Sequence, residues 1–72
     1  MNTKYKYIHF RKSSLDNIDW DVVNNKSKSV LGYVFWYTSW KQYVFTQAEA
    51  NVIFSVGCLE DIIDFIKQLK QK

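Results

Sequence analysis

Proline is absent from this chain of 72 residues, and glycine, cysteine and histidine are rare, with two, one and one residues. Without proline, nothing interrupts a strand and no X-Pro bond slows folding. With Gly32 and Gly57 as its only glycines, the chain has no glycine-rich phosphate loop. Cys58 alone cannot form a disulfide within the chain, and Cys58 with His9 cannot supply the four ligands of a structural zinc site. We therefore expect no cofactor and no bound metal.

Long apolar runs are also missing. No run approaches the roughly 18 residues that a membrane-spanning helix needs. Residues 1–6 are polar and lack the apolar core of a signal peptide. A single unpaired cysteine is typical of a reducing compartment. We expect a cytoplasmic protein that contacts no membrane.

The length predicts one small domain, residues 1–72. Domains of this size bury only roughly 60% of the surface that the unfolded chain exposes, and disulfides, metals or oligomerisation usually add stability. Since the first two are excluded, oligomerisation remains, and we expect a homo-oligomer, most simply a dimer. The aromatic share of 18% supplies large side chains for burial or contact.

The most informative segment is residues 30–37, which predicts a strand that is apolar on both faces. Alternation divides its side chains into two sets: Leu31, Tyr33, Phe35 and Tyr37 against Val30, Val34 and Trp36. A sheet with one face in water would alternate apolar with polar residues instead. Gly32 inside the segment indicates a bulge, or a ring lying over bare backbone.

Further strands are expected on both sides of this segment. Their approximate bounds are 5–12, 18–24, 42–46 and, as a short fifth strand, 52–54. In the second of these, Ile18, Trp20 and Val22 alternate with Asp19 and Asp21, which is typical of a half-exposed strand near a sheet edge. Residues 24–29 carry turn residues and predict a hairpin between the second strand and the central one.

One helix is expected over residues 56–70, with Ser55 as its N-cap and apolar residues at helical spacing after it. Strands followed by a helix predict an α+β fold, with an antiparallel sheet of four to five strands and one C-terminal helix packed on one face. The helix is a rod roughly 22 Å long and about 10 Å across, whereas four strands make a sheet about 15–19 Å wide. It can cover one face only, so an apolar face remains for a partner.

The sequence therefore predicts an interaction surface made of aromatic side chains. Its candidate residues are Tyr33, Phe35, Trp36, Tyr37, Trp40 and Tyr43. One interpretation is a core or a homodimer interface. The other is a stacking platform for single-stranded nucleic acid, with Lys26, Lys28 and Lys41 at the strand ends. The net charge of +3 permits nucleic-acid binding without indicating it.

Catalytic interpretations are weaker than structural ones at each candidate position. Cys58 with His9 could form a nucleophile and base, but a lone cysteine on the apolar face of a helix is typical of a buried small side chain. Asp16, Asp19 and Asp21 could hold a cation, yet their spacing matches no calcium loop. We therefore expect no enzyme and no catalytic residue.

Several short motifs form one pattern over roughly residues 22–69. They are Leu31-Gly32, Trp36-Tyr37, Trp40-Lys41-Gln42-Tyr43-Val44-Phe45, Phe54-Ser55, Cys58-Leu59-Glu60-Asp61-Ile62, Asp64-Phe65-Ile66 and Leu69. This pattern resembles a family of short uncharacterised phage and prophage proteins, in particular those of SPβ-type prophages. The resemblance implies a phage-encoded accessory protein in the cytoplasm of a bacterial host, and it carries over no functional residue.

The expected function is that of a non-enzymatic accessory protein that acts through protein–protein interaction and self-associates through the uncovered face or a sheet edge. The partner would be a second copy, a host protein or a phage protein. The alternative is a single-stranded nucleic-acid-binding protein that uses the aromatic face of its sheet.

Overall fold

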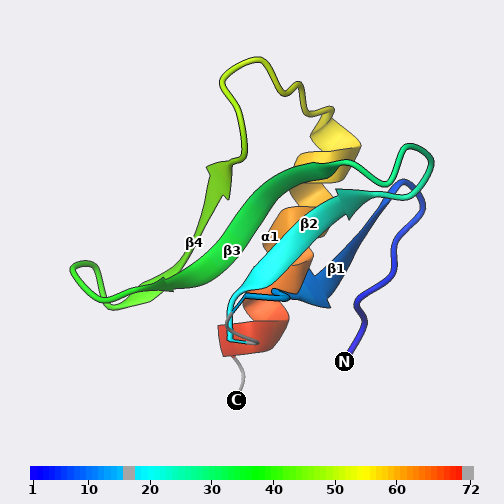
Figure 1. Cartoon of the computed structure of the whole chain (residues 1–72). Coiled ribbons are helices and arrows are strands. Elements are labelled where there is room, and N and C mark those ends of the chain that lie inside the picture. The colour runs from blue at the N-terminus through cyan, green and yellow to red at the C-terminus, as the bar shows by residue number, and fades with distance from the viewer. Residues whose placement is uncertain (16–17, 71–72) are drawn as a thin grey trace.

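The computed structural model describes residues 1–15 and 18–70 and contains four strands followed by one helix. The elements are β1 (Ile8–Lys12), β2 (Trp20–Asn24), β3 (Val30–Tyr37), β4 (Gln42–Gln47) and α1 (Val56–Lys70). The strands form one antiparallel sheet in the order β1-β2-β3-β4, and α1 lies against one of its faces (Figure 1). The predicted α+β fold class is confirmed.

The expected fifth strand over 52–54 is wrong. In the described part of the chain the sheet has four strands, and residues 52–54 lie in the loop before α1 without strand pairing. Phe54 instead contacts the Phe45 ring edge to face, with centroids 5.1 Å apart. The side-chain amide of Gln47 in β4 also donates to the Val52 carbonyl at 2.9 Å, so side-chain contacts rather than a backbone ladder hold this segment beside β4.

Two strand predictions need correction. The first strand begins at Ile8 rather than residue 5, because the chain bends at residues 6 and 7. β2 adjoins the edge strand β1 but is itself an interior strand, because it pairs with β1 on one side and β3 on the other. It begins at Trp20, so Ile18 lies in the preceding loop with 71% of its surface exposed, not on the apolar face as expected.

The predicted hairpin between β2 and β3 is confirmed. The Asn24 side-chain oxygen accepts hydrogen bonds from the backbone N–H groups of Lys26 and Ser27, at 2.8 and 3.0 Å. The Asn24 carbonyl accepts another from Lys28, whose φ of 65° is in the left-handed region. A side chain that bonds its own turn therefore closes this hairpin.

α1 has the predicted bounds and the predicted cap. The Ser55 hydroxyl accepts a hydrogen bond from the Cys58 N–H at 3.2 Å, and the Ser55 carbonyl accepts the first helical bond, from Leu59, at 3.0 Å. Lys67 and Lys70 lie in the last turn, where the helix dipole favours positive charge.

The core lies between α1 and the face of the sheet that we call the inner face. Its buried side chains are Ile8, Phe10, Val22, Val34, Ile62, Phe65 and Leu69. The Phe65 ring stacks on Phe10 with centroids 3.9 Å apart and meets Trp20 edge to face at 5.0 Å. The helix is thus held mainly by one fully buried ring between two rings of the sheet.

A bulge in β3 changes the predicted face of one residue. Val22 pairs with Gly32 and Val23 with Val30, so Leu31 is the extra residue. Leu31 packs against the core instead of sharing a face with Tyr33. Both expectations for Gly32 are confirmed, because it adjoins this bulge and a Cβ there would lie 2.6 Å from the Phe45 ring.

The N-terminal segment is tied to α1 by hydrogen bonds. The Tyr5 hydroxyl donates to the Asp64 carboxylate at 2.7 Å, and the Gln68 amide donates to the Tyr5 oxygen at 3.0 Å. Asn2 and Gln68 exchange two further bonds, of 2.8 and 2.9 Å. Burial, followed by the bond to Asp64 and its negative charge, raises the pKa of Tyr5 above its ordinary value.

Candidate interaction surface

The face of the sheet turned away from α1, the outer face, carries a row of exposed rings. We define the outer aromatic surface as Tyr33, Phe35, Tyr37 and Trp40. Since Val34 faces the core, its neighbours in β3 project outward. Tyr33, Tyr37 and Trp40 are 40%, 39% and 66% exposed. Figure 1 shows α1 behind the sheet, and no helix of the described chain covers the front.

The rings of this surface support one another. Phe35 and Tyr37 meet edge to face with centroids 6.4 Å apart, and Tyr37 meets Trp40 in the same way at 5.1 Å. Trp40 belongs to the turn between β3 and β4 and extends the row beyond the strand. Rings that hold each other in this way present a rigid apolar surface, which loses little conformational entropy when a partner binds.

The loop between β1 and β2 adds apolar area that the sequence interpretation missed. A hollow of about 330 Å³ on the outer face is lined by Ser13, Leu15, Asp19, Tyr33, Phe35 and Thr46. Leu15 is 95% exposed, and Ile18 follows in the same loop. The sequence feature that could have indicated this area is Leu15, an apolar residue inside a run of turn residues, where it has no apolar neighbour in sequence to pack against.

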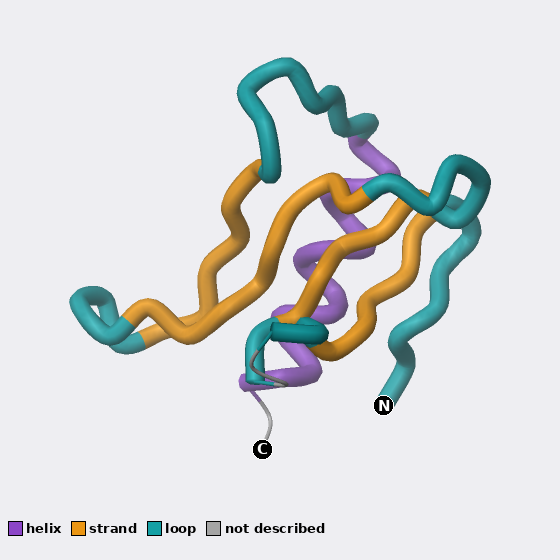
Figure 2. Tube along the Cα trace, in the orientation of Figure 1, coloured by secondary structure: helices purple, strands orange, loops and turns teal. Residues whose placement is uncertain are grey.

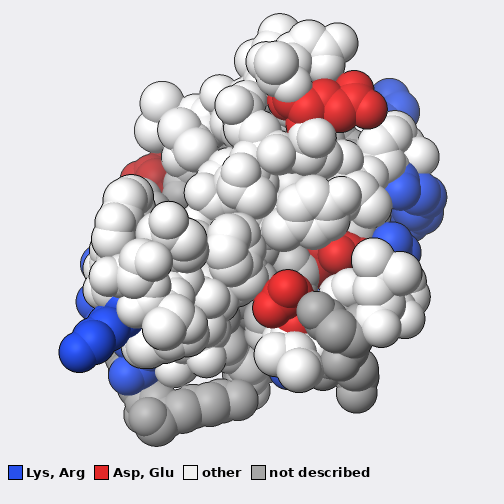
Figure 3. Space-filling view, turned by 60° about the vertical axis from the view of Figure 1, so that its left-hand side comes forward, with Lys and Arg blue, Asp and Glu red and all other residues white. Residues whose placement is uncertain are grey.

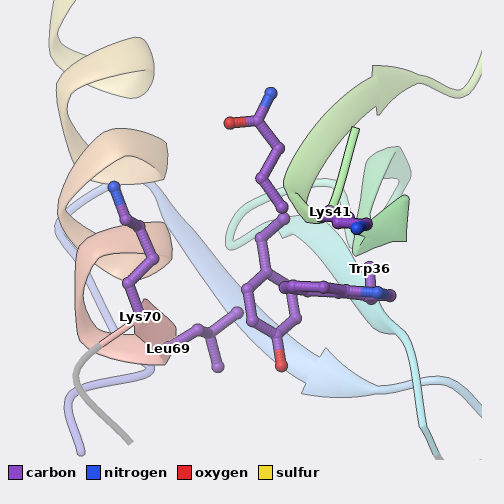
Figure 4. Close-up of a pocket in the computed structure, with 6 residues that line it drawn as sticks. Trp36, Lys41, Leu69 and Lys70 are labelled. Atoms are coloured by element: carbon purple, nitrogen blue, oxygen red, sulfur yellow. The ribbon is translucent and has the colours of Figure 1, made fainter. Parts of the chain in front are cut away.

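Two of the six predicted residues lie elsewhere. Trp36 and Tyr43 project from the inner face, and their rings meet edge to face at 5.3 Å. With the C-terminal end of α1 they border a groove of about 420 Å³, which Leu69 enters from the helix and Trp36 from the sheet (Figure 4). The predicted single surface is therefore divided between the two faces, because side chains alternate along β3.

The outer face carries little net charge. On its strands the charged residues are Arg11 and Asp21, which form an ion pair with Nε and Oδ2 3.2 Å apart. Figure 3, turned toward the β4 side, shows a broad surface that is mostly uncharged, with a few aspartate and glutamate side chains within it and lysine and arginine at its margins. Lys41 lines the groove beside Trp36 rather than the outer aromatic surface. The rings thus lie near the neutral Arg11–Asp21 pair and, at the hollow, near the carboxylate of Asp19.

The expected position of Asp21 on a solvated strand face is wrong. Asp21 does face outward, but β2 is a central strand, and its cross-strand neighbours Arg11 and Tyr33 leave it 7% exposed. Asp16 lies outside the described residues. Among residues 1–15 and 18–70, no group of three histidine, cysteine or acidic side chains is placed to hold a metal ion.

His9 and Cys58 lie on opposite sides of the sheet. Cys58 packs against the core from α1, whereas His9 alternates with the buried Ile8 and Phe10 and so projects outward. The amide nitrogen of Asn25 donates to the carbonyls of Tyr5 and Lys6, at 2.9 and 3.1 Å. Its oxygen therefore accepts from His9 Nδ1 at 2.7 Å, which assigns the proton to that nitrogen. Asn25 thus links the β2–β3 turn to the N-terminal segment and to His9 of β1.

Comparison with known proteins gives one informative similarity. The chain is 26% identical over 72 residues to an uncharacterised 9.3 kDa protein of Acholeplasma phage L2, across 99% of this chain and 91% of that protein. No protein-family model and no solved structure matches. The similarity supports a short phage-type protein and not the narrower resemblance to SPβ-type prophage proteins. In the described chain, α1 lacks the length and apolar character of a membrane-spanning helix.

Proposed function

We propose that this chain is a non-enzymatic, phage-type accessory protein that self-associates and binds a further protein through its outer aromatic surface. The observation that carries the proposal is the exposure of Tyr33, Tyr37 and Trp40 on a sheet face without a covering element in the described chain. Contiguous exposed apolar surface of this kind marks interaction sites in water-soluble proteins, and aromatic rings dominate the energetics of such contacts.

The charge distribution favours a protein partner over nucleic acid. A stacking platform for single strands combines exposed rings with cations that follow the phosphate backbone. Here Arg11 is paired with Asp21, while Lys41 lies at the Trp36 groove. A nearly neutral aromatic surface would leave the phosphates without partners, whereas it matches the desolvated centre of a protein interface.

The placement of the candidate catalytic groups supports a non-enzymatic role. The sheet separates the Cys58 thiol from the His9 imidazole, so these two side chains cannot act as nucleophile and base on one substrate. Asp64 accepts the Tyr5 hydrogen bond and Asp21 pairs with Arg11, which gives both carboxylates structural partners. As a lone thiol is typical of reducing compartments, we place the protein in the host cytoplasm.

Affinity capture from host lysate with matched variants tests the proposal. The triple variant Tyr33→Thr/Tyr37→Thr/Trp40→Ser removes the exposed rings and keeps strand-forming residues in β3. The control is Ile53→Ser, which removes an apolar side chain that is 90% exposed in the loop before α1. We expect a protein that the wild type and the control retain and the triple variant loses. Identical retention by all three would contradict the proposal.

A second measurement separates the nucleic-acid alternative. Tryptophan fluorescence is recorded while single-stranded oligonucleotide is added at low and at high salt. Trp40, at 66% exposure, would report a base that stacks on the outer aromatic surface. We expect no change at either salt concentration. Quenching that weakens as salt rises would favour nucleic-acid binding instead.

A further inference from the structure

The two edges of the sheet are finished differently. Along β1, residues 3–5 run beside the strand (Figure 2), the Phe10 N–H donates to the Thr3 carbonyl at 2.8 Å, and the Ile8 carbonyl accepts from Tyr5 at 2.9 Å. A short bridge between Lys4 and His9 completes this cover. The β1 edge is therefore largely occupied by the chain itself.

The β4 edge is open. The Ala48 N–H donates to the Leu31 carbonyl at 2.9 Å, which makes that pair a hydrogen-bonded one. Because hydrogen-bonded and non-bonded pairs alternate along an antiparallel ladder, the N–H and C=O groups of Tyr43, Phe45 and Gln47 point away from β3. Within the described residues, no backbone hydrogen bond reaches these groups from another element.

The sequence of β4 also lacks the usual protection of an open edge. Natural edge strands avoid unwanted pairing through charged residues, proline or bulges. Gln42–Gln47 contains neither a charged residue nor proline, and its pairing with β3 runs without a register shift. A neutral six-residue strand with aromatic and β-branched side chains is prone to pair with another strand. We expect this edge to be covered in the working protein.

We propose that β4 pairs antiparallel with β4 of a second copy about a two-fold axis, which joins the two sheets into one. A second copy is the occupant that covers the open β4 edges of both molecules in one closed dimer. The β1 edges at the two ends of the joined sheet are already occupied, so no further copy is added. Opposed residues in an antiparallel pair project to the same face of the sheet. The two-fold axis therefore lies midway between the two copies of one residue, and not between residues that are neighbours in sequence. Centring it on Phe45 engages the outward groups of Tyr43, Phe45 and Gln47 in both copies.

This β4 pairing gives a structure to the self-association that we propose above, and it rests on the proposal that the protein self-associates. A two-fold axis perpendicular to the sheet keeps both outer aromatic surfaces on one side and both helices on the other. Val44 and Thr46 lie opposite each other across the axis on the outer face. Leu59 and Ile63, 43% and 53% exposed, lie on the helix flank that Lys70 shares, toward the β4 groove. They would add apolar contact near the axis.

Amide hydrogen exchange of the full-length protein tests the pairing with an internal control. The amides of Val44 and Thr46 bond to β3 in every state, whereas those of Tyr43, Phe45 and Gln47 are bonded only in the dimer. At a concentration about one hundred times the dimer dissociation constant, mass action predicts exchange about tenfold slower for the second group than in dilute protein. The first group should show no such dependence on concentration.

A pair of variants tests the same contact independently. Gln47→Pro removes one outward N–H without touching the ladder to β3, and Gln47→Ala keeps the N–H while losing the same side chain. We expect light scattering to show a dimer for the wild type and Gln47→Ala, and dissociation at least about tenfold easier for Gln47→Pro. Far-UV circular dichroism confirms that both variants fold.

The outcomes separate the two proposals. A dimer in which the amides of Tyr43, Phe45 and Gln47 exchange at the dilute rate overturns the β4 pairing and leaves self-association intact. A strictly monomeric protein at hundreds of micromolar overturns both the pairing and self-association. Neither result bears on capture of a further protein by the outer aromatic surface.

Discussion

Both faces of the sheet carry aromatic rings, but fully buried rings are found at the centre of the inner face, where α1 packs against the sheet. Phe10 and Phe65 are 3% and 0% exposed and stack at 3.9 Å, whereas Tyr37 and Trp40 keep 39% and 66% of their surface in solvent. Aromatic residues are therefore buried on one face of the sheet and partly exposed on the other. The inner rings bury apolar area during folding, whereas the outer rings leave apolar area exposed, which is what the proposed contact requires.

The reason for the difference is geometric. α1 is one helix of 15 residues, and its buried side chains Ile62, Phe65 and Leu69 all contact the inner face. A rod about 10 Å wide covers one side of a sheet and cannot reach the other. The three partly exposed rings of the opposite face therefore lie beyond the reach of α1, and we propose that they serve contact with a partner rather than stability.

The largest expected effect comes from the centre of the inner face. Phe65→Ala removes the ring that fills the space between Phe10 and Trp20. We expect a loss of about 3–5 kcal/mol in the free energy of unfolding, which is a large share of the total stability of a small domain. Urea denaturation followed by circular dichroism measures it. A loss below about 1 kcal/mol would show that the inner face does not hold the fold.

The two glycines provide a matched pair for the second prediction. A Cβ at Gly32 would lie 2.4 Å from the Thr46 carbonyl oxygen, whereas one at Gly57 meets nothing nearer than 3.8 Å. We expect Gly32→Ala to lower the free energy of unfolding by about 1–3 kcal/mol through overpacking. Gly57→Ala lies in α1 and should raise it by about 0.5–1 kcal/mol. Thermal unfolding of both variants checks the opposite signs.

A smaller effect is expected where the N-terminal segment meets α1. Tyr5→Phe removes the hydroxyl that donates to Asp64, at a cost of about 1 kcal/mol. The raised pKa of Tyr5 favours its protonated form in the folded state, so its contribution is present below the ordinary pKa of 10.0 and falls as the pH rises above it. The stability difference between wild type and Tyr5→Phe should therefore shrink from about pH 8 to about pH 11 in urea titrations. A difference that grows would contradict the bond.

Much of this fold follows from local patterns in the sequence. The unbroken run of apolar and aromatic residues over 30–37 predicts a strand with two apolar faces. The cap at Ser55, with apolar residues at helical spacing after it, predicts the bounds of α1. Asn24 predicts its turn because its side chain bonds neighbouring N–H groups. Each of these signals acts within a few residues of chain.

Other features depend on contacts between distant segments and could not be predicted in this way. The bulge that turns Leu31 inward arises from the register between β2 and β3. The burial of Asp21 depends on β2 lying between two strands, which its alternating pattern does not reveal. The division of the predicted surface follows from alternation, because Trp36 and Tyr37 are neighbours in sequence and project from opposite faces of β3.

The most direct test of the central claim compares the two faces in one urea denaturation series at low protein concentration. The triple variant Tyr33→Thr/Tyr37→Thr/Trp40→Ser removes three rings of the outer face, and Phe65→Ala removes one ring from the core. We predict that the triple variant folds cooperatively and loses less unfolding free energy than Phe65→Ala alone. A triple variant that loses as much as Phe65→Ala, or fails to fold, would show that the outer rings serve folding rather than contact.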